Sequence, residues 1–553
     1  MREAHRLSLV AVTFLSLVTM TCTCSLSGQS DAPPRNAVTI EVAANTALTP
    51  WLEMAVKDFN ASRRKTSAGR PVYIVLSHVE AGRLAQEVSG GRALPALWIP
   101  DDPVWVDLLA DRGYPAYQGQ CLSLAESPLV IAMWRPLAEA LGWPGRSLGW
   151  LDIGSLAADP SAWAYYSGGE FGDTLRLGHT HPGLSGSGAS ALLAIVQAAQ
   201  ASTSAVTVDD IRQPIVQASV GAFEAAVSWF SPTTDELGRT MRQRGVSYLG
   251  AAIMYESTVV YYGSGDPALV PIYPFEGTFV ATHPACINST AGAELQEAAA
   301  LFRSYLLEEK AQRMALSVGL RPVTAGIAPG APLDRAHGVD LEEPVKIFGA
   351  AGVEALYAIQ ELWQAARKNV NLVMLLDVSG SMEGDKLESA RRAAIQFVEQ
   401  MGDRDFLTLI TFSERPQILA EHEQVGTSRT RVIELLEGLE VQTSTALYDA
   451  IAAGAAAVAR TAVPQTSNVM VLLTDGVDTS STRFRFDQEL VDLVAASGSV
   501  VCTIAYGDDA DEELLSELAI KTNGLFYRGD EANIAAIYEE LSAAFGGSAG
   551  IGR

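Results

Sequence analysis

The sequence predicts an α/β protein that contains more than one domain. From about Val38 onward, short apolar segments alternate with longer stretches of helical periodicity, as in sheets whose strands are joined through helices. The chain has 553 residues, more than one hydrophobic core usually organises, so two or three domains are expected. Hydrophobic residues make up 48% and charged residues 19%, which is typical of folded chains and not of disordered ones.

The C-terminal third is predicted to form a mostly parallel sheet flanked by helices. Its apolar segments are nearly continuous, as expected for strands that are buried on both faces. The expected strands are 370–376, 406–412, 469–474, 500–506 and 525–528. The expected helices are 386–401, 430–439, 446–460, 487–496, 512–522 and 533–545.

The first half is predicted to be a separate α/β domain. Strands are expected at 38–42, 72–76 and 129–133, with helical stretches between them. A segment rich in Pro, Gly and Ala at 321–341 marks a boundary. The apolar residues of 353–366 then recur at helical spacing, which predicts a connecting helix where the two halves meet.

Oxygen-bearing side chains follow three segments of the C-terminal third. Asp377, Ser379 and Ser381 follow the strand 370–376 at alternate positions, so they can face one point. Thr445 opens a predicted helix, and Asp475 follows the strand 469–474. Such a donor set suits a hard divalent cation at the carboxyl ends of the strands. The competing interpretation is that Ser379 and Thr445 only cap helices.

On these motifs, residues 370–546 resemble the von Willebrand factor A (VWA) family, with a Rossmann-like fold and a metal-ion-dependent adhesion site. The resemblance implies that Asp377, Ser379, Ser381, Thr445 and Asp475 bind Mg²⁺, with Ca²⁺ or Mn²⁺ as alternatives. It also implies a partner protein whose carboxylate completes the coordination. Thr443 stays a minor alternative to Thr445, because bacterial members often have Gly-Gly before the threonine and this chain has Thr443-Ser444.

Residues 38–328 resemble a bacterial extracellular solute-binding protein of the kind that serves ABC importers. The resemblance is carried by the segments 91–101, 127–133, 177–188, 254–257 and 273–279. It implies a two-lobed, periplasmic-binding-protein-like domain with a small solute in its cleft.

Six residues are candidate solute ligands. Ser185 and Ser187 precede a helical run and Asn45 and Thr46 follow the first strand, so both corners could bind an anion through helix amides. The alternative is that these are plain caps and turns. Tyr255 and Glu256 are further candidates, although Glu256 could instead pair within the hinge.

The five cysteines divide between export and folding. Arg2 and Arg6 precede an apolar run at 7–18, which is typical of a signal peptide over 1–24. Cys22 and Cys24 follow as candidate lipid attachment points; an ordinary cleaved signal or a short anchor is the alternative. Cys121 and Cys286, the remaining pair within one predicted domain, are expected to form a disulfide. Cys502 is expected to be a buried thiol.

These features predict an exported, non-enzymatic protein on the outer face of the membrane. A tether at 25–37, a linker and connecting helix at 329–369 and a flexible tail at 547–553 complete the organisation.

The net charge is −25, and 29 Asp and Glu against 13 Lys and Arg lie in 370–553, which excludes nucleic acid as a partner. No nucleophile elbow, Gly-Lys phosphate loop or zinc helix motif indicates an enzyme. The alternative function is an ABC-importer receptor whose VWA domain docks envelope partners.

Overall fold

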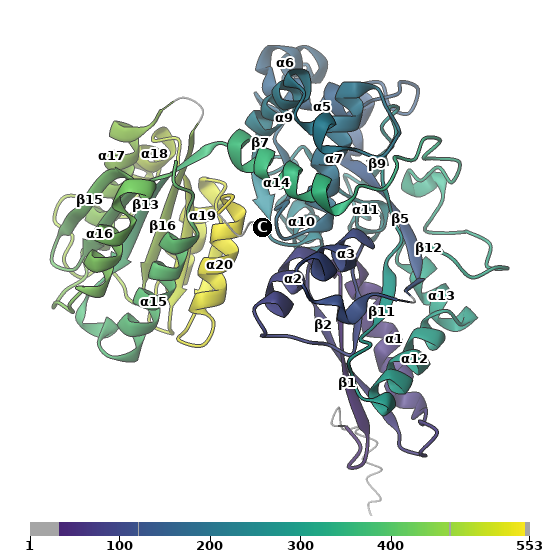
Figure 1. Cartoon of the computed structure of the whole chain (residues 1–553). Coiled ribbons are helices and arrows are strands. Elements are labelled where there is room, and N and C mark those ends of the chain that lie inside the picture. Colours follow the sequence, from purple (N-terminus) through teal and green to yellow (C-terminus); the bar gives the residue numbers. More distant parts are fainter. Residues whose placement is uncertain (1–32, 120, 464–465, 548–553) are drawn as a thin grey trace, which may run out of the picture.

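The computed structural model describes residues 33–119, 121–463 and 466–547. Figure 1 shows two modules, a larger one formed by the first part of the chain and a smaller one formed by its last third. The predicted α/β class is confirmed in both. The predicted signal segment with Cys22 and Cys24, most of the tether and residues 548–553 lie outside the described residues.

The first lobe of the larger module contains a sheet with the order β2-β1-β3-β11-β4. Its strands are β1 (Val38–Ala44), β2 (Val72–His78), β3 (Leu97–Ile99), β4 (Leu122–Ser123) and β11 (Pro284–Ile287). One face carries α1 (Thr49–Ser62), α12 (Ala293–Leu306) and α13 (Glu309–Ser317). Ile40 and Val42 pack on that face, whereas Ala43 packs with α2 (Ala81–Ser89) and α3 (Val104–Asp111). This alternation along β1 is the two-residue period of a strand.

The second lobe contains a sheet with the order β10-β5-β8-β6-β7, with β9 and β12 also paired to β5. Its strands are β5 (Ala125–Trp134), β6 (Leu177–Thr180), β7 (Val227–Ser231), β8 (Ala251–Tyr255), β9 (Leu269–Ile272), β10 (Val280–Ala281) and β12 (Arg321–Pro322). Its helices are α4 (Arg135–Ala140), α5 (Trp150–Ala158), α6 (Pro160–Ser167), α7 (Gly186–Gln200), α8 (Val208–Ile211), α9 (Pro214–Ala226), α10 (Thr234–Arg244) and α11 (Glu256–Tyr262). Because α7 follows β6 and α10 follows β7, both helices begin at the carboxyl ends of strands.

Two cysteines of the larger module are joined. A disulfide links Cys121 to Cys286 of β11. Cys502 is a buried free thiol in the smaller module, and burial raises its pKa to about 12.

The smaller module is a six-stranded sheet with the order β15-β14-β13-β16-β17-β18, parallel except at the β14–β15 pair. The strands are β13 (Asn369–Asp377), β14 (Phe406–Phe412), β15 (Pro416–Gln424), β16 (Thr466–Thr474), β17 (Val500–Tyr506) and β18 (Phe526–Gly529). The helices α15 (Asp385–Gln400), α16 (Val425–Glu437) and α20 (Ile534–Ala544) cover one face. The helices α17 (Leu447–Thr461), α18 (Gln488–Ala496) and α19 (Glu512–Lys521) cover the other. The predicted mostly parallel sheet flanked by helices is confirmed.

Strand β15 is absent from the sequence-based prediction. It pairs antiparallel with β14 at the edge of the sheet, and Ala420 is its one buried residue. An edge strand with polar side chains on both faces lacks the apolar run that marks the other strands.

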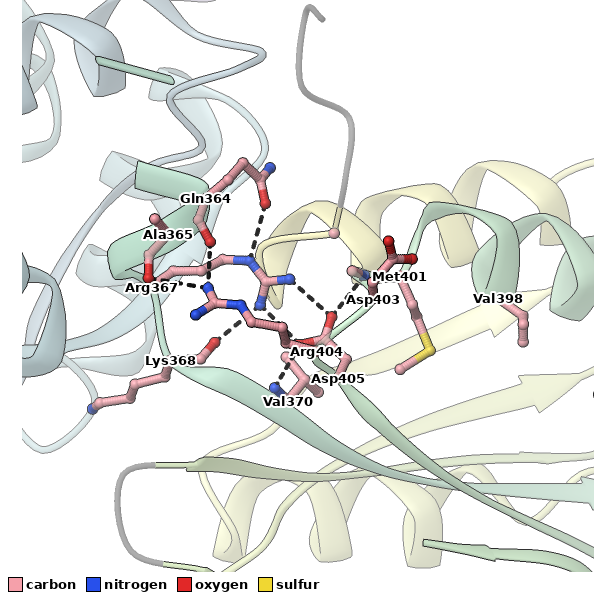
Figure 2. A network of polar contacts seen from close by, with 12 residues as sticks. Gln364, Ala365, Arg367, Lys368, Val370, Val398, Met401, Asp403, Arg404 and Asp405 are labelled. Atoms are coloured by element: carbon pink, nitrogen blue, oxygen red, sulfur yellow. Dashed lines mark hydrogen bonds and ion pairs between the residues drawn. The ribbon is translucent and has the colours of Figure 1, made fainter. Parts of the chain in front are cut away.

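The helix α14 (Val353–Ala366) leads directly into β13, and a buried ion pair lies at the connection between them. The guanidinium of Arg367 donates two hydrogen bonds, of 3.0 and 2.8 Å, to the carboxylate of Asp405. The same carboxylate accepts from the backbone amides of Val370 and Gly402, and Arg404 binds the Gln364 and Ala365 carbonyls (Figure 2). The end of α14 is therefore hydrogen-bonded to the loop before β14 of the smaller module.

Helix α20 lies against both lobes of the larger module (Figure 1). Arg83 of the first lobe forms an ion pair with Glu539 of α20. On the second lobe, Trp229 packs edge-to-face against Phe545 at 5.7 Å between ring centroids, and His181 Nε2 lies 2.9 Å from the Gly547 carbonyl oxygen. The last helix of the smaller module therefore bridges the two lobes.

Candidate functional site

The central strand β13 ends in a carboxylate, that of Asp377. Asp377 is buried, and its Oδ1 accepts from the backbone amide of Ser379 at 2.8 Å. Its Oδ2 accepts from the hydroxyl of Thr474 at 2.6 Å. Burial raises the pKa of Asp377 to about 6. The loop after β13 and the neighbouring strand β16 therefore fix the orientation of this carboxylate.

Hydroxyl groups and a second carboxylate gather beside Asp377. Ser379 Oγ lies 3.1 Å from Ser381 Oγ, which donates at 2.6 Å to Asp475 Oδ1. A β-carbon built on Gly476 would lie 3.9 Å from both Ser381 Oγ and Thr445 Oγ1, so the Thr445 hydroxyl faces the same space. The structure thus brings together the five residues predicted to bind a cation.

Lys386 is a member of this site that the sequence interpretation missed. Its Nζ lies 2.7 Å from Asp475 Oδ2, and the Asp475 side chain is buried while that of Lys386 is 26% exposed. In the sequence, Lys386 is an ordinary lysine in the first turn of an amphipathic helix, and such residues usually face solvent. Its role depends on the contact with Asp475, which the sequence does not reveal.

The donor set fits a hard divalent cation. In octahedral coordination at the Mg²⁺–oxygen distance, adjacent ligand oxygens lie about 3 Å apart, close to the oxygen spacings between Ser379, Ser381 and Asp475. Among the described residues no group of three or more His, Cys, Asp or Glu is placed to bind a metal. The fit therefore depends on the serine and threonine hydroxyls, which hard cations accept and soft metals do not prefer.

Two nearby residues have other contacts. Thr443 is exposed and donates to Glu414 Oε1 at 2.9 Å. Asp449 accepts hydrogen bonds from the backbone amides of residues 482–484, so it orders a loop beside α17. Thr445, and not Thr443, shares the space above Gly476 with Ser381.

A second polar cluster lies between the two lobes of the larger module. Asn45 Nδ2 donates to Glu80 Oε2 at 3.0 Å, and the Thr46 hydroxyl also donates to the Glu80 carboxylate. Thr234, at the start of α10 in the other lobe, donates its backbone amide to Glu80 Oε1 at 2.9 Å. Burial raises the pKa of Glu80.

Ser185 and Ser187, the candidate solute ligands at the start of α7, belong to the same cluster. Ser187 Oγ lies 3.0 Å from Ser185 Oγ and 2.9 Å from Thr234 Oγ1. Tyr255 donates its hydroxyl to Asp101 Oδ2 at 2.5 Å. The structure therefore brings together Asn45, Thr46, Ser185, Ser187 and Tyr255.

Glu256 points elsewhere. Its carboxylate accepts from Arg321 at 2.8 and 2.6 Å and from the hydroxyl of Tyr273. Arg321 belongs to β12, which pairs with β5 where the chain passes between the lobes. Glu256 is therefore engaged within the hinge, the alternative considered from the sequence.

Glu80 and Asp101 are the cluster members that the sequence interpretation missed. Each follows a strand of the first lobe, Glu80 after β2 and Asp101 after β3. That position is a usable signal, because ligands of α/β proteins collect at the carboxyl ends of strands. The sequence does not show that both carboxylates meet helices of the opposite lobe.

A cavity of about 330 Å³ lies outside Glu80 and beneath α20. Its lining includes Glu80 and Arg83 from the first lobe, Glu236 from the second and Glu539 and Glu540 from α20. The smaller module thus forms one wall at the mouth of the cleft.

The two modules define a two-lobed binding protein joined to a Rossmann-like domain with a hydroxyl-rich site. A family model described as bacterial extracellular solute-binding protein matches residues 40–321, about half of the chain, and the chain belongs to that family. A second model, von Willebrand factor type A domain, matches residues 371–540. VWA domains commonly bind a divalent cation, and neither description is that of an enzyme.

Known relatives match the smaller module. An uncharacterized protein of Synechocystis sp. is 28% identical over 158 residues, which cover 29% of this chain and 37% of that protein. The inter-alpha-trypsin inhibitor heavy chain H4 of Sus scrofa is 27% identical over 199 residues, or 34% of this chain and 20% of that one. The chain thus spans from a fifth to under two fifths of these relatives.

Solved structures resemble each module in part. The von Willebrand factor type A protein from Catenulispora acidiphila has a TM-score of 0.29 at 22% identity and covers 32% of this chain and 43% of that one. The sulfate-binding protein SubI from Mycobacterium tuberculosis has a TM-score of 0.39 at 17% identity, covering 57% and 95%. These similarities are too low to support a functional argument.

The family assignment fits an exported protein, because the matched family is extracellular. In the part of the chain that the structure describes, no helix is both long and apolar enough to cross a bilayer.

Proposed function

We propose that this protein is a non-enzymatic component of the cell envelope whose VWA module binds a partner protein through a divalent cation, with Mg²⁺ the first choice. The observation that carries the proposal is the convergence of Asp377, Ser379, Ser381, Thr445 and Asp475 beside an exposed loop. When bound, the cation would supply a coordination position for a carboxylate of the partner.

The charge of the site supports this mode of binding. Among the groups in direct contact, the carboxylates of Asp377 and Asp475 would offset a divalent cation, and the ammonium group of Lys386 adds one positive charge. A site with surplus positive charge attracts an incoming carboxylate. Ser381 is exposed, so a partner can approach the hydroxyl edge while the two aspartates stay buried.

The solute-binding module would hold the VWA module in position at the outer face of the membrane. The Arg367–Asp405 ion pair and the contacts of α20 support a defined arrangement of the two modules. Attachment would come from a lipid on Cys22 or Cys24, which lie ahead of the first described residue.

Titration of the purified chain with Mn²⁺, followed by electron paramagnetic resonance, tests the cation site. Wild type should bind one Mn²⁺ ion, and Asp377→Ala should weaken binding by more than about 100-fold, because even outer-shell changes at metal sites cost 10–100-fold. The control is Asp508→Ala, which removes an exposed carboxylate just after the neighbouring strand β17. Equal binding by wild type and Asp377→Ala would contradict the proposal.

The partner's carboxylate can be tested with acetate as a probe. Added acetate should change the spectrum of the Mn²⁺ bound to wild type if a coordination position is open. An unchanged spectrum at saturating acetate would leave a cation site without the proposed docking chemistry. The partner would then be identified among the envelope proteins that wild type retains in Mg²⁺ and releases when Mg²⁺ is chelated.

A second candidate is a receptor for an ABC importer, favoured by the family match over residues 40–321. In this case the VWA module would dock other envelope components. Micromolar capture of a small solute by wild type, undiminished in Asp377→Ala, would favour this candidate.

A further inference from the structure

Two helices of the second lobe begin at the cleft, α7 at Gly186 and α10 at Thr234. They are 15 and 11 residues long, so the first amides of each have no partner within the helix, and its start is the positive end of a helix dipole. Such a pair of helix ends is suited to hold an anion between the lobes. The groups that face these ends decide whether a solute anion can enter.

The start of α10 is occupied by a carboxylate from the first lobe. Glu80 Oε1 accepts the Thr234 amide at 2.9 Å, and its other oxygen accepts from Asn45. The Thr46 hydroxyl binds the same carboxylate. Glu80 is 2% exposed. Its donors therefore come from both lobes, as the donors to a bound solute would.

The start of α7 is occupied by a second carboxylate from the first lobe. A β-carbon at Gly186 would collide with both side-chain oxygens of Asp101, so this carboxylate touches the first helical residue. Asp101 is completely buried. Its Oδ2 accepts from Tyr255 of the second lobe, whereas its Oδ1 has no hydrogen-bond partner among the described residues.

No basic side chain neutralises these two carboxylates in the described part of the chain. The hydrogen bonds of Glu80 and Asp101 come from amides and hydroxyl groups. His283 lies near Asp101 through its backbone amide, but burial lowers the pKa of His283 to about 3, so its ring is neutral. The helix ends are therefore the positive groups that these carboxylates face.

We propose that Glu80 and Asp101 are built-in anionic ligands, which fill the anion-binding ends of α10 and α7, hold the lobes closed without a solute and exclude free oxyanions. The backbones of the lobes are already in contact, since a β-carbon at Gly82 would collide with the Gly183 carbonyl and the Arg83 amide donates to the Leu184 carbonyl at 3.2 Å. An oxyanion would have to displace a carboxylate and overcome its charge.

The inference does not depend on the cation site of the VWA module, and its test is separate. Sulfate is the probe, compared with chloride at equal ionic strength by calorimetric titration and by thermal unfolding. At pH 8, where Asp101 is ionised although burial raises its pKa to about 7, wild type should show no sulfate binding. Asp101→Ala exposes the start of α7 and should gain it, with sulfate at about 100 times Kd raising Tm by about 5 °C.

Two variants control for general effects of the substitution. Asp107→Ala removes an exposed carboxylate on the neighbouring helix α3 and should not gain sulfate binding. Asp101→Asn fills the same space without a charge and should also bind no sulfate. Gain of binding by Asp101→Ala alone supports the inference.

Two results would overturn it. Micromolar sulfate binding by wild type would show that the carboxylates do not occupy the anion position, whatever the variants do. A folded Asp101→Ala protein with the same Tm in sulfate and chloride would show that the start of α7 is not an anion site.

Discussion

The cleft of the solute-binding module and the loop site of the VWA module are built from the same parts, but one is sealed and the other is open. Both place carboxylates and hydroxyl groups at the carboxyl ends of strands. In the cleft, Glu80 and Asp101 are buried and engaged by groups of the opposite lobe. In the VWA module, Asp377 and Asp475 are buried, yet Ser381 beside them is exposed.

The two sites differ in the positive groups that face their carboxylates. In the cleft, Glu80 accepts from the first amide of α10 and Asp101 touches the first residue of α7, so both carboxylates face helix N-termini of the same chain. In the VWA module, Lys386 engages one oxygen of Asp475, while the hydroxyls of Ser379, Ser381 and Thr445 can still serve as ligands. Similar polar clusters can therefore either stabilise a fold or bind a ligand.

The largest expected effect concerns which threonine completes the open site. Thr445→Val should weaken Mn²⁺ binding by about 10–100-fold, because it removes a hydroxyl from the space shared with Ser381. Thr443→Val is the matched control and should bind Mn²⁺ as wild type does, since Thr443 contacts Glu414 instead. The reverse order of the two effects would move the site away from Gly476.

The next effect concerns the sealed cleft, where the contribution of Asp101 to stability should depend on pH. Burial raises the pKa of Asp101 from 3.8 to about 7, so between these values the folded state binds a proton that the unfolded chain has released. The contribution of Asp101 to stability should therefore fall as pH rises from about 4 to 7, by at most about 1.4 kcal/mol per pH unit. Chemical denaturation of wild type and Asp101→Asn across this range measures it.

The difference between the two profiles is the informative quantity. Burial lowers the pKa of His181 to about 4 and that of His283 to about 3. Both histidines therefore reduce the stability of the folded protein as pH falls below about 6.5. They contribute equally to wild type and Asp101→Asn and cancel. A flat difference would contradict the raised pKa of Asp101.

The smallest effect concerns Lys386, whose ammonium group pairs with Asp475 in the open site. Lys386→Met should raise the affinity for Mn²⁺ by about tenfold, because it removes a positive charge that pairs with Asp475. It should also weaken the effect of acetate on the bound ion. Lys521→Met, which alters an exposed pair with Glu517, is the control; an equal change in both variants would exclude a specific role for Lys386.

The fold was more predictable from the sequence than the function of the cleft. The apolar strands and the order of Asp377, Thr445 and Asp475 are local patterns, and the sheet brings their ends together by topology alone. Strand β15 escaped prediction because its exposed edge position leaves no apolar pattern. The cleft depends on contacts between lobes, such as Glu80 with Thr234, which no local pattern reveals.

Native mass spectrometry of the wild-type chain with Mn²⁺ and sulfate both present tests the central contrast most directly. An open cation site and a self-filled cleft predict one bound Mn²⁺ ion, no bound sulfate and loss of the metal in Asp377→Ala. Sulfate retained on a chain that carries no metal would contradict both halves of the account.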